Sequence, residues 1–223
     1  MSGYHAPPIA ALLRFLLWTV LVLGVIGGFL HLTMLRVWRV PMNDPVLQAS
    51  LAPTLEAGDL VVLWRLTEPT FGDLVLCPEP DYPERVVIGR VFGEGNDVVE
   101  FKKGSPKVNG KAFQIERQCS PNEFTVTHPD DESKEVTQRC FWEAMANRVH
   151  MAGSTRSFGD ARDWEETEVP PGQLYLVSDN RLFPYDSRDY GPVPKDSCRE
   201  TVVFRLVSRE GWGDADARLS VIQ

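Results

Sequence analysis

The chain has 223 residues and a formal net charge of −8. Charged residues make up 24% of it and hydrophobic residues 43%, which is the balance of a folded protein and excludes a largely disordered one. An acidic chain lacks the basic face expected of nucleic-acid-binding proteins, so no nucleic-acid partner is expected. The four cysteines form no CxxC pair, and we predict no metal site.

The N-terminal region holds the only long apolar segment. Residues 15–34 contain no Asp, Glu, Lys or Arg, and a run of about twenty such residues is enough to cross a membrane as a helix. We therefore interpret residues 1–40 as an N-terminal segment with one transmembrane anchor. The alternative, a cleaved secretory signal, is less favoured because the run exceeds the ~7–15-residue apolar region of such signals.

The charges beside the apolar run give a weak orientation signal. Arg14 lies before the run, and Arg36 and Arg39 lie after it. Since positive charge favours the cytoplasmic side, this distribution leans toward a cytoplasmic C-terminal domain.

The remaining chain predicts a mostly β fold. Short apolar or β-branched runs alternate with turn signals such as Gly72-Asp73 and Asn109-Gly110. The expected strands cover residues 60–66, 74–77, 85–92, 98–101, 107–113, 173–177 and 201–207, with Lys103-Gly104 as a further turn and residues 41–45 as a linker. Few segments beyond the anchor show a helical period, so we expect a partly open barrel or sandwich.

Residues 114–168 differ from their surroundings because they are polar and alternate weakly. We predict an inserted smaller β subdomain or long loops there, with the core formed by residues 41–113 and 169–223. Cys119 and Cys140 flank a hairpin in the insertion. A disulfide between them would contribute about 3 kcal/mol in an oxidising compartment, and two buried thiols are the alternative. Cys77 and Cys198 occupy strand-like segments and are interpreted as core residues, with their pairing left open.

Several motifs together resemble the type I signal peptidase family. Ser50 begins a Ser-Leu-Ala-Pro-Thr-Leu stretch, similar to the S-M-x-P-T-L nucleophile motif of that family. The run from residue 178 to 191 resembles the family's last signature, G-D-N-R-x-N-S-x-D-S-R-x-x-G. The positions in register are Asp179, Asn180, Arg181, Asp186, Ser187, Arg188 and Gly191. Gly58-Asp59, residues 72–75 and residues 169–175 match further landmarks.

The resemblance implies a membrane-anchored serine endopeptidase that acts on signal peptides of exported preproteins. Its fold would be the family's complex β barrel or sandwich, with the C-terminal domain outside the cytoplasm at the cell (inner) membrane. Ser50 would be the nucleophile, and its backbone N–H, helped by Gln48, would stabilise the oxyanion. The expected partners are preproteins bound by strand addition, membrane lipid and a paralogous signal peptidase, with no metal or organic cofactor.

The general base of the family is absent from its expected position. A serine hydroxyl needs a base, and the family supplies a lysine in I-K-R-V-V-G-x-P-G-D-x-V. The matching stretch is residues 88–99, where Gly89 occupies the lysine position, and the first lysine of the whole chain is Lys102. Pro184 stands where the family has a serine that orients the lysine.

Substitute bases are few. Arg85 and Arg90 remain protonated at working pH. His128 and His150 lie in the insertion, where we expect them to be exposed. The other candidates are Lys102, Lys103 and Glu84, of which Glu84 is a weak match for a serine proton.

Three functions therefore remain open. One is a signal-peptidase-type endopeptidase with an unknown base. The second is a catalytically inactive homologue that binds signal peptides or an active paralogue. The third is a self-cleaving repressor-type relative, which the membrane anchor disfavours. In all three, Asp179, Asp186, Arg181 and Arg188, together with Asn180 and Ser187, are interpreted as a network that supports the site, because buried charges require partners.

Overall fold

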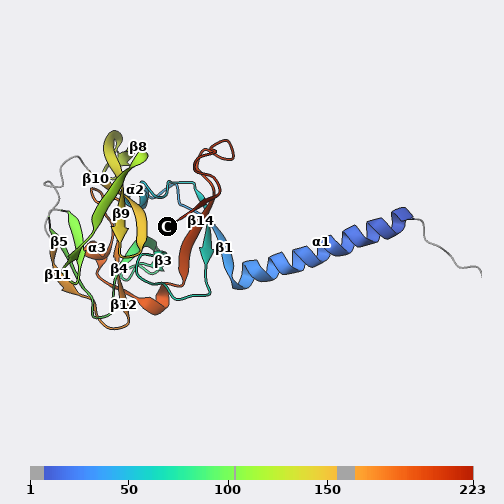
Figure 1. Cartoon of the computed structure of the whole chain (residues 1–223), viewed down its shortest axis with the longest axis horizontal. Helices are drawn as coiled ribbons and strands as arrows, with labels where there is room; N and C mark the ends of the chain where they lie inside the picture. The colour runs from blue at the N-terminus through green and yellow to red at the C-terminus, as the bar shows by residue number, and fades with distance from the viewer. Residues whose placement is uncertain (1–7, 103, 155–163, 223) are drawn as a thin grey trace, which may run out of the picture.

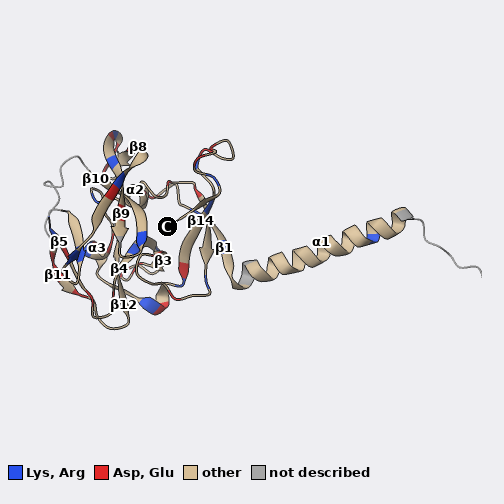
Figure 2. Cartoon of the chain, in the orientation of Figure 1, with Lys and Arg blue, Asp and Glu red and all other residues tan. Residues whose placement is uncertain are grey.

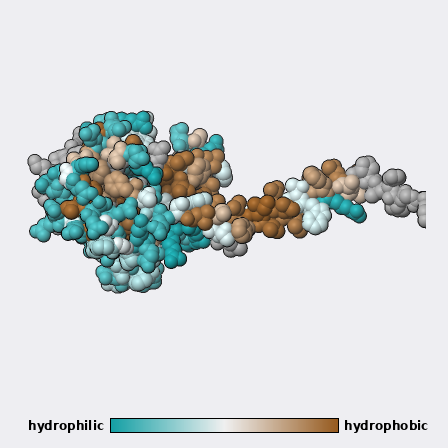
Figure 3. Space-filling model, turned by 60° about the horizontal axis from the view of Figure 1, so that its bottom comes forward, coloured by the Kyte–Doolittle hydropathy of each residue, from teal (hydrophilic) through white to brown (hydrophobic). Residues whose placement is uncertain are grey.

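The computed structural model describes residues 8–102, 104–154 and 164–222. Helix α1 (Pro8–Thr33) projects away from a β-rich body (Figure 1). Its segment Ile9–Leu30 has a mean hydropathy of 2.5 and is not buried against the body. Figure 3 shows this helix as a hydrophobic rod, and Figure 2 shows that it carries hardly any charge. Twenty-two residues of helix span about 33 Å, enough to cross a membrane.

The largest sheet confirms the mostly β prediction. Its strands run in the order β1-β2-β14-β3-β4-β12-β13, with β15 beside β14, and neighbouring strands are antiparallel. The bounds are β1 (Leu35–Arg39), β2 (Leu60–Trp64), β3 (Leu74–Pro78), β4 (Val86–Glu94), β12 (Gln173–Val177), β13 (Val193–Pro194), β14 (Glu200–Val207) and β15 (Ser220–Val221).

Strand β4 is the centre of the core because both of its faces are covered. Val87 and Val91 pack with residues of β3 and β12 on one face. Ile88 packs on the other face with Leu47 and Leu51. A strand buried on both faces reads as a continuous apolar run, which is how residues 86–92 appear in the sequence.

A second sheet extends the core at the end of β4. Its order is β11-β5-β6-β7, with β5 (Val98–Lys102), β6 (Ser105–Val108), β7 (Lys111–Ala112) and β11 (Trp164–Glu168). Asn109 and Gly110 have φ of 50° and 74°, so the predicted turn is present between β6 and β7. The predicted turn at Lys103-Gly104 lies partly outside the described residues.

Residues 114–154 form a separate three-stranded sheet with the order β10-β9-β8. Its strands are β8 (Gln114–His128), β9 (Asp131–Met145) and β10 (Arg148–Ser154). Strand β8 therefore lies at an edge. The proposed boundaries of the insertion at residues 114 and 168 stay a prediction, since β11 pairs with β5 and not with this sheet.

All four cysteines form disulfides. The Cys119–Cys140 bond joins β8 to β9, which is the first of the two alternatives that the sequence left open. Cys77 and Cys198, interpreted from the sequence as core residues, are both buried and bonded to each other. This second bond joins β3 to the end of the 3-10 helix η2 (Lys195–Ser197), just before β14.

Two short helices were not expected from the sequence. Helix α2 (Pro45–Leu51) begins inside the segment interpreted as a linker. Asp44 caps it by accepting a hydrogen bond from Leu47 N at 2.9 Å, and Pro45 occupies the first turn, where its missing N–H costs nothing. Helix α3 (Ser187–Tyr190) is held by a capping box between Asp186 and Asp189.

Candidate active site

Ser50 lies on the inner face of α2 and is fully buried. Its Oγ donates a hydrogen bond to the carbonyl of Leu47 at 2.8 Å, one helical turn earlier. Its backbone N–H belongs to an α-helix, in which N–H groups are directed at the carbonyl four residues earlier. The predicted oxyanion role of this N–H would therefore require local opening of α2, and it stays a prediction.

Asn180 fixes the backbone around Ser50. Its N–H donates to the carbonyl of Ser50 at 3.1 Å, and its Nδ2 donates to the carbonyl of Ala49 at 2.7 Å. Its Oδ1 accepts from the N–H groups of Leu182 and Phe183. The predicted proximity of Ser50 and the 178–191 signature is thus present in the structure.

Asp179 forms a fully buried ion pair with Arg90. Nε and Nη2 of Arg90 lie 2.9 and 2.8 Å from the two carboxylate oxygens of Asp179. The Thr54 hydroxyl donates to the same carboxylate at 2.6 Å. Burial alone would raise the pKa of Asp179, but the charge and hydrogen bonds of Arg90 outweigh it and lower the pKa to about 2.

A second buried pair joins the insertion to the signature. Nη2 of Arg181 lies 2.5 Å from Oε2 of Glu143 on β9. Its Nη1 donates to the carbonyl of Ser178. Strand β10 adds backbone links, since Gly153 N donates to Asp179 O at 2.8 Å and Arg181 N donates to Gly153 O at 2.7 Å.

His150 lies between the two pairs. Its Nε2 is 3.4 Å from Oε2 of Glu143 and 4.0 Å from Oδ1 of Asp179, and neither ring nitrogen makes a well-aligned hydrogen bond. The side chain is 1% exposed, so the expectation that the insertion's histidines are exposed is wrong for His150. Burial lowers the pKa of His150, and the charge of Arg90 lowers it further against the opposing effect of Glu143 and Asp179.

The sequence holds a signal for this contact in the pairing of β9 with β10. Glu143 and His150 stand directly opposite each other in the β9–β10 register. A tight turn at residues 146–147 would have placed the acid beside the imidazole. Arg90, predicted only to stay protonated, and Thr54, placed by its motif without a role, complete the buried cluster.

The remaining signature residues hold the loop itself. Asp186 pairs with Arg188 through two side-chain contacts of 2.8 and 2.6 Å, and it accepts from Ser178 N at 2.8 Å. The charge of Arg188 keeps the pKa of Asp186 below its usual range despite complete burial. Ser187 Oγ accepts from Leu176 N at 2.9 Å. These contacts are those of a structural network.

Gly89, at the family's lysine position, lies in β4 opposite Val75 of β3. A Cβ atom at this residue would lie 2.9 Å from the Cβ of Leu176 and 3.5 Å from the backbone N of Val177. Strand β12 therefore occupies the space into which a side chain at residue 89 would extend.

None of the substitute bases that the structure describes forms a hydrogen bond with the Ser50 hydroxyl. Lys102 is exposed and pairs with Glu100, and Arg85 pairs with Glu79. Glu84 is exposed in a turn, and Lys103 lies outside the described residues. Among the residues that the structure describes, the Leu47 carbonyl is the one hydrogen-bond partner of the Ser50 hydroxyl.

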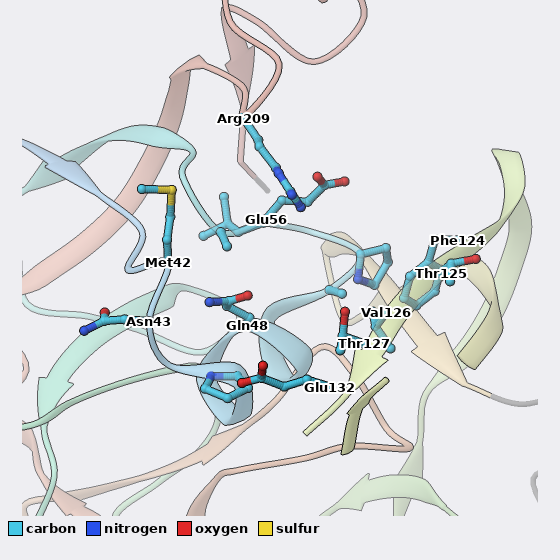
Figure 4. Close-up of a pocket in the computed structure, with 15 residues that line it drawn as sticks. Met42, Asn43, Gln48, Glu56, Phe124, Thr125, Val126, Thr127, Glu132 and Arg209 are labelled. Atoms are coloured by element: carbon cyan, nitrogen blue, oxygen red, sulfur yellow. The ribbon is translucent and has the colours of Figure 1, made fainter. Parts of the chain in front are cut away.

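Gln48 faces a cleft of about 610 Å³ beside α2. Figure 4 shows its amide directed into the cleft between the linker residues Met42 and Asn43 and strand β8. Ala52 and Pro53 line the same cleft, so residues on both sides of Ser50 contribute to its wall.

A family model described as "Signal peptidase, peptidase S26" matches residues 12–207. The chain belongs to this family. It is 27% identical over 176 residues to signal peptidase I of Aquifex aeolicus, covering 67% of this chain and 69% of that protein. It is 28% identical over 97 residues to mitochondrial inner membrane protease subunit 1 of Schizosaccharomyces pombe, covering 43% of this chain and 57% of that protein. It is 27% identical over 121 residues to signal peptidase I V of Bacillus subtilis, covering 54% of this chain and 56% of that protein.

Among solved structures, signal peptidase I from Enterococcus faecalis covers 61% of this chain and 98% of its own, with a TM-score of 0.37 and 19% sequence identity. Family membership confirms the resemblance on which the motif assignments rest. Catalytic activity is a separate question, since it depends on the side chains around Ser50.

The buried imidazole makes stability depend on pH. Because the pKa of His150 is lowered on folding, the unfolded state binds the proton more readily, and stability falls as the pH drops through the unfolded value near 6.5. We expect His150→Gln to lose less stability than the wild type between pH 7.5 and pH 5.5, measured by urea unfolding.

His128→Gln is the matched control, since His128 contacts Phe183 at the end of the hairpin and lies outside the buried cluster. It should keep the wild-type pH dependence. The raised pKa values of Glu56 and Asp189 act in the opposite direction, but they are common to all three proteins. If the free energy of unfolding depended on pH equally in wild type and His150→Gln, the assignment of this dependence to His150 would be contradicted.

Gly89 can be tested as a steric constraint. Gly89→Ala places a methyl group against Leu176, and overpacking of this kind destabilises by about 1–3 kcal/mol. Gly213→Ala is the control, because nothing lies within 4 Å of the position that its methyl group would take. Chemical denaturation should show a loss for the first variant and less than about 0.5 kcal/mol for the second. If the two variants were equally stable, β12 would have moved to accept the methyl group, and the steric constraint at Gly89 would be contradicted.

Proposed function

We propose that this chain is a membrane-anchored signal peptidase homologue that binds signal-peptide-bearing preproteins without cleaving them. The observation that carries the proposal is the state of Ser50. Its hydroxyl is fully buried, it donates to the Leu47 carbonyl at 2.8 Å, and no described base reaches it. A serine hydroxyl in that state is a poor nucleophile.

Binding a preprotein does not require a general base, whereas cleaving it with a serine does. The family fold and the signature network are retained, including the Asn180 contacts around Ser50 and the Arg90–Asp179 pair. An inactive homologue of this kind would hold a preprotein or associate with an active paralogue at the membrane.

The second candidate is an active serine endopeptidase, the function that the resemblance implies. It is favoured by the retention of Ser50 in its motif and by the neutral form that burial favours for His150. For this mechanism, α2 would have to shift so that Ser50 meets a base.

We propose that the C-terminal domain lies outside the cytoplasm, with α1 as a single membrane span. Two disulfides support an oxidising compartment. The arginines that follow α1 favour the opposite orientation. The disulfides outweigh them here, because few charges flank the span.

The two functions can be separated with the full chain in proteoliposomes and a secretory preprotein. We expect wild type and Ser50→Ala to bind the preprotein with dissociation constants within about twofold of each other, and neither to release a mature product on a gel. The preprotein without its signal peptide is the control and should bind at least tenfold more weakly.

Cleavage by the wild type that is lost in Ser50→Ala would establish the endopeptidase instead. Failure of the wild type to bind the preprotein at all would overturn the binding proposal.

A further inference from the structure

Strand β8 leaves one of its edges open. In the sheet order β10-β9-β8, strand β9 occupies one side of β8, and no described strand occupies the other. An open edge presents unpaired N–H and C=O groups, which are the groups that pair with an added strand.

The cleft beside α2 runs along this open edge. Four consecutive residues, Phe124, Thr125, Val126 and Thr127, line it. Successive side chains of a strand point to opposite faces, so a cleft lined by four neighbours reaches past the strand's edge, and Glu132, near the turn into β9, also lines it. Figure 4 shows β8 forming the wall of the cleft across from Met42 and Asn43.

The opposite wall is continuous with the candidate active site. Gln48 lies two residues before Ser50, and Ala52 and Pro53 follow it closely. A chain lying in the cleft would therefore run past the helix that carries Ser50. A cleft of about 610 Å³ is large enough for several residues of extended peptide.

The side chains of β8 suit an extended peptide. Phe124 and Val126 are half-buried, whereas Thr125 and Thr127 are exposed. A strand added to this edge would meet an apolar row on one face and a hydroxyl-bearing row on the other. The backbone would supply affinity for any extended sequence, and the alternating rows would select among side chains.

We infer that the open edge of β8, residues 124–127, is a docking strand for an extended segment of the bound preprotein. This inference rests on the proposed function and adds the location of the bound segment. It assigns to the inserted sheet a direct contact with the ligand. In this arrangement the preprotein segment lies along β8, facing Met42 and Asn43 across the cleft, and completes the sheet as a fourth strand.

Site-specific photo-crosslinking tests this placement. A benzophenone-bearing amino acid is introduced in place of Thr125 in the full chain, and in a separate protein in place of Thr137. Thr137 is the cross-strand partner of Thr125 and its hydroxyl lies 3.3 Å from that of Thr125, so both proteins lose the same contact. Only Thr125 lines the cleft.

Both proteins are incubated in proteoliposomes with a secretory preprotein and irradiated. We expect crosslinking to the preprotein from residue 125 to exceed that from residue 137 by at least tenfold. The preprotein lacking its signal peptide should give no adduct above background from either position.

Preprotein that binds but crosslinks equally, or not at all, from both positions would overturn the docking strand and leave the proposed function standing. Crosslinks between two copies of this chain through residue 125 would also overturn it, because the edge would then be a dimer interface. Absence of any preprotein binding would remove the proposed function and this inference together.

Discussion

The buried carboxylate of Asp179 is the constraint on which the site depends. A carboxylate taken out of water costs several kcal/mol unless it is paired and hydrogen-bonded. Asp179 meets that requirement through Arg90 of β4 and Thr54 of the segment after α2. One side chain thus joins the central strand, the last signature and the Ser50 motif, and removing Arg90 would leave an uncompensated charge in the core.

The same constraint places Ser50. Because Asp179 is fixed, the next residue, Asn180, is held where it can bond the carbonyls of Ala49 and Ser50. The inserted sheet reinforces this arrangement through the Glu143–Arg181 pair and the backbone contacts of Gly153. The contacts that hold Ser50 are therefore in place, while the position that supplies a base in the family holds Gly89, packed against β12. Because no described side chain acts as a base for Ser50, we propose that the site serves recognition and not turnover.

Much of this scaffold could be predicted from the sequence. The apolar runs and the Gly or Asn turns located most strands, because alternating burial and turn formation depend on residues that are neighbours in the sequence. The motifs located Ser50 and the acidic and basic side chains of the last signature. The missing lysine was also visible, since residues 88–99 keep the family spacing around Gly89.

Other features depend on tertiary contacts that a single sequence does not display. Helix α2 is short, and its seven residues are stabilised by the Asp44 cap and by burial of Leu47 and Leu51. The burial of His150 depends on strands β9 and β10 folding against the signature loop, which the weak alternation of residues 114–168 did not reveal. The Cys77–Cys198 pairing likewise joins residues 121 positions apart.

The central claim is that the Ser50 hydroxyl is buried and that no side chain in the described part of the chain serves it as a base. Reaction of the full chain with a fluorophosphonate that phosphonylates activated serines tests this claim most directly, with intact-mass spectrometry as the readout. The account predicts no adduct on Ser50 at about pH 8. A stoichiometric adduct that disappears in Ser50→Ala would contradict it, since only an accessible and activated serine forms one.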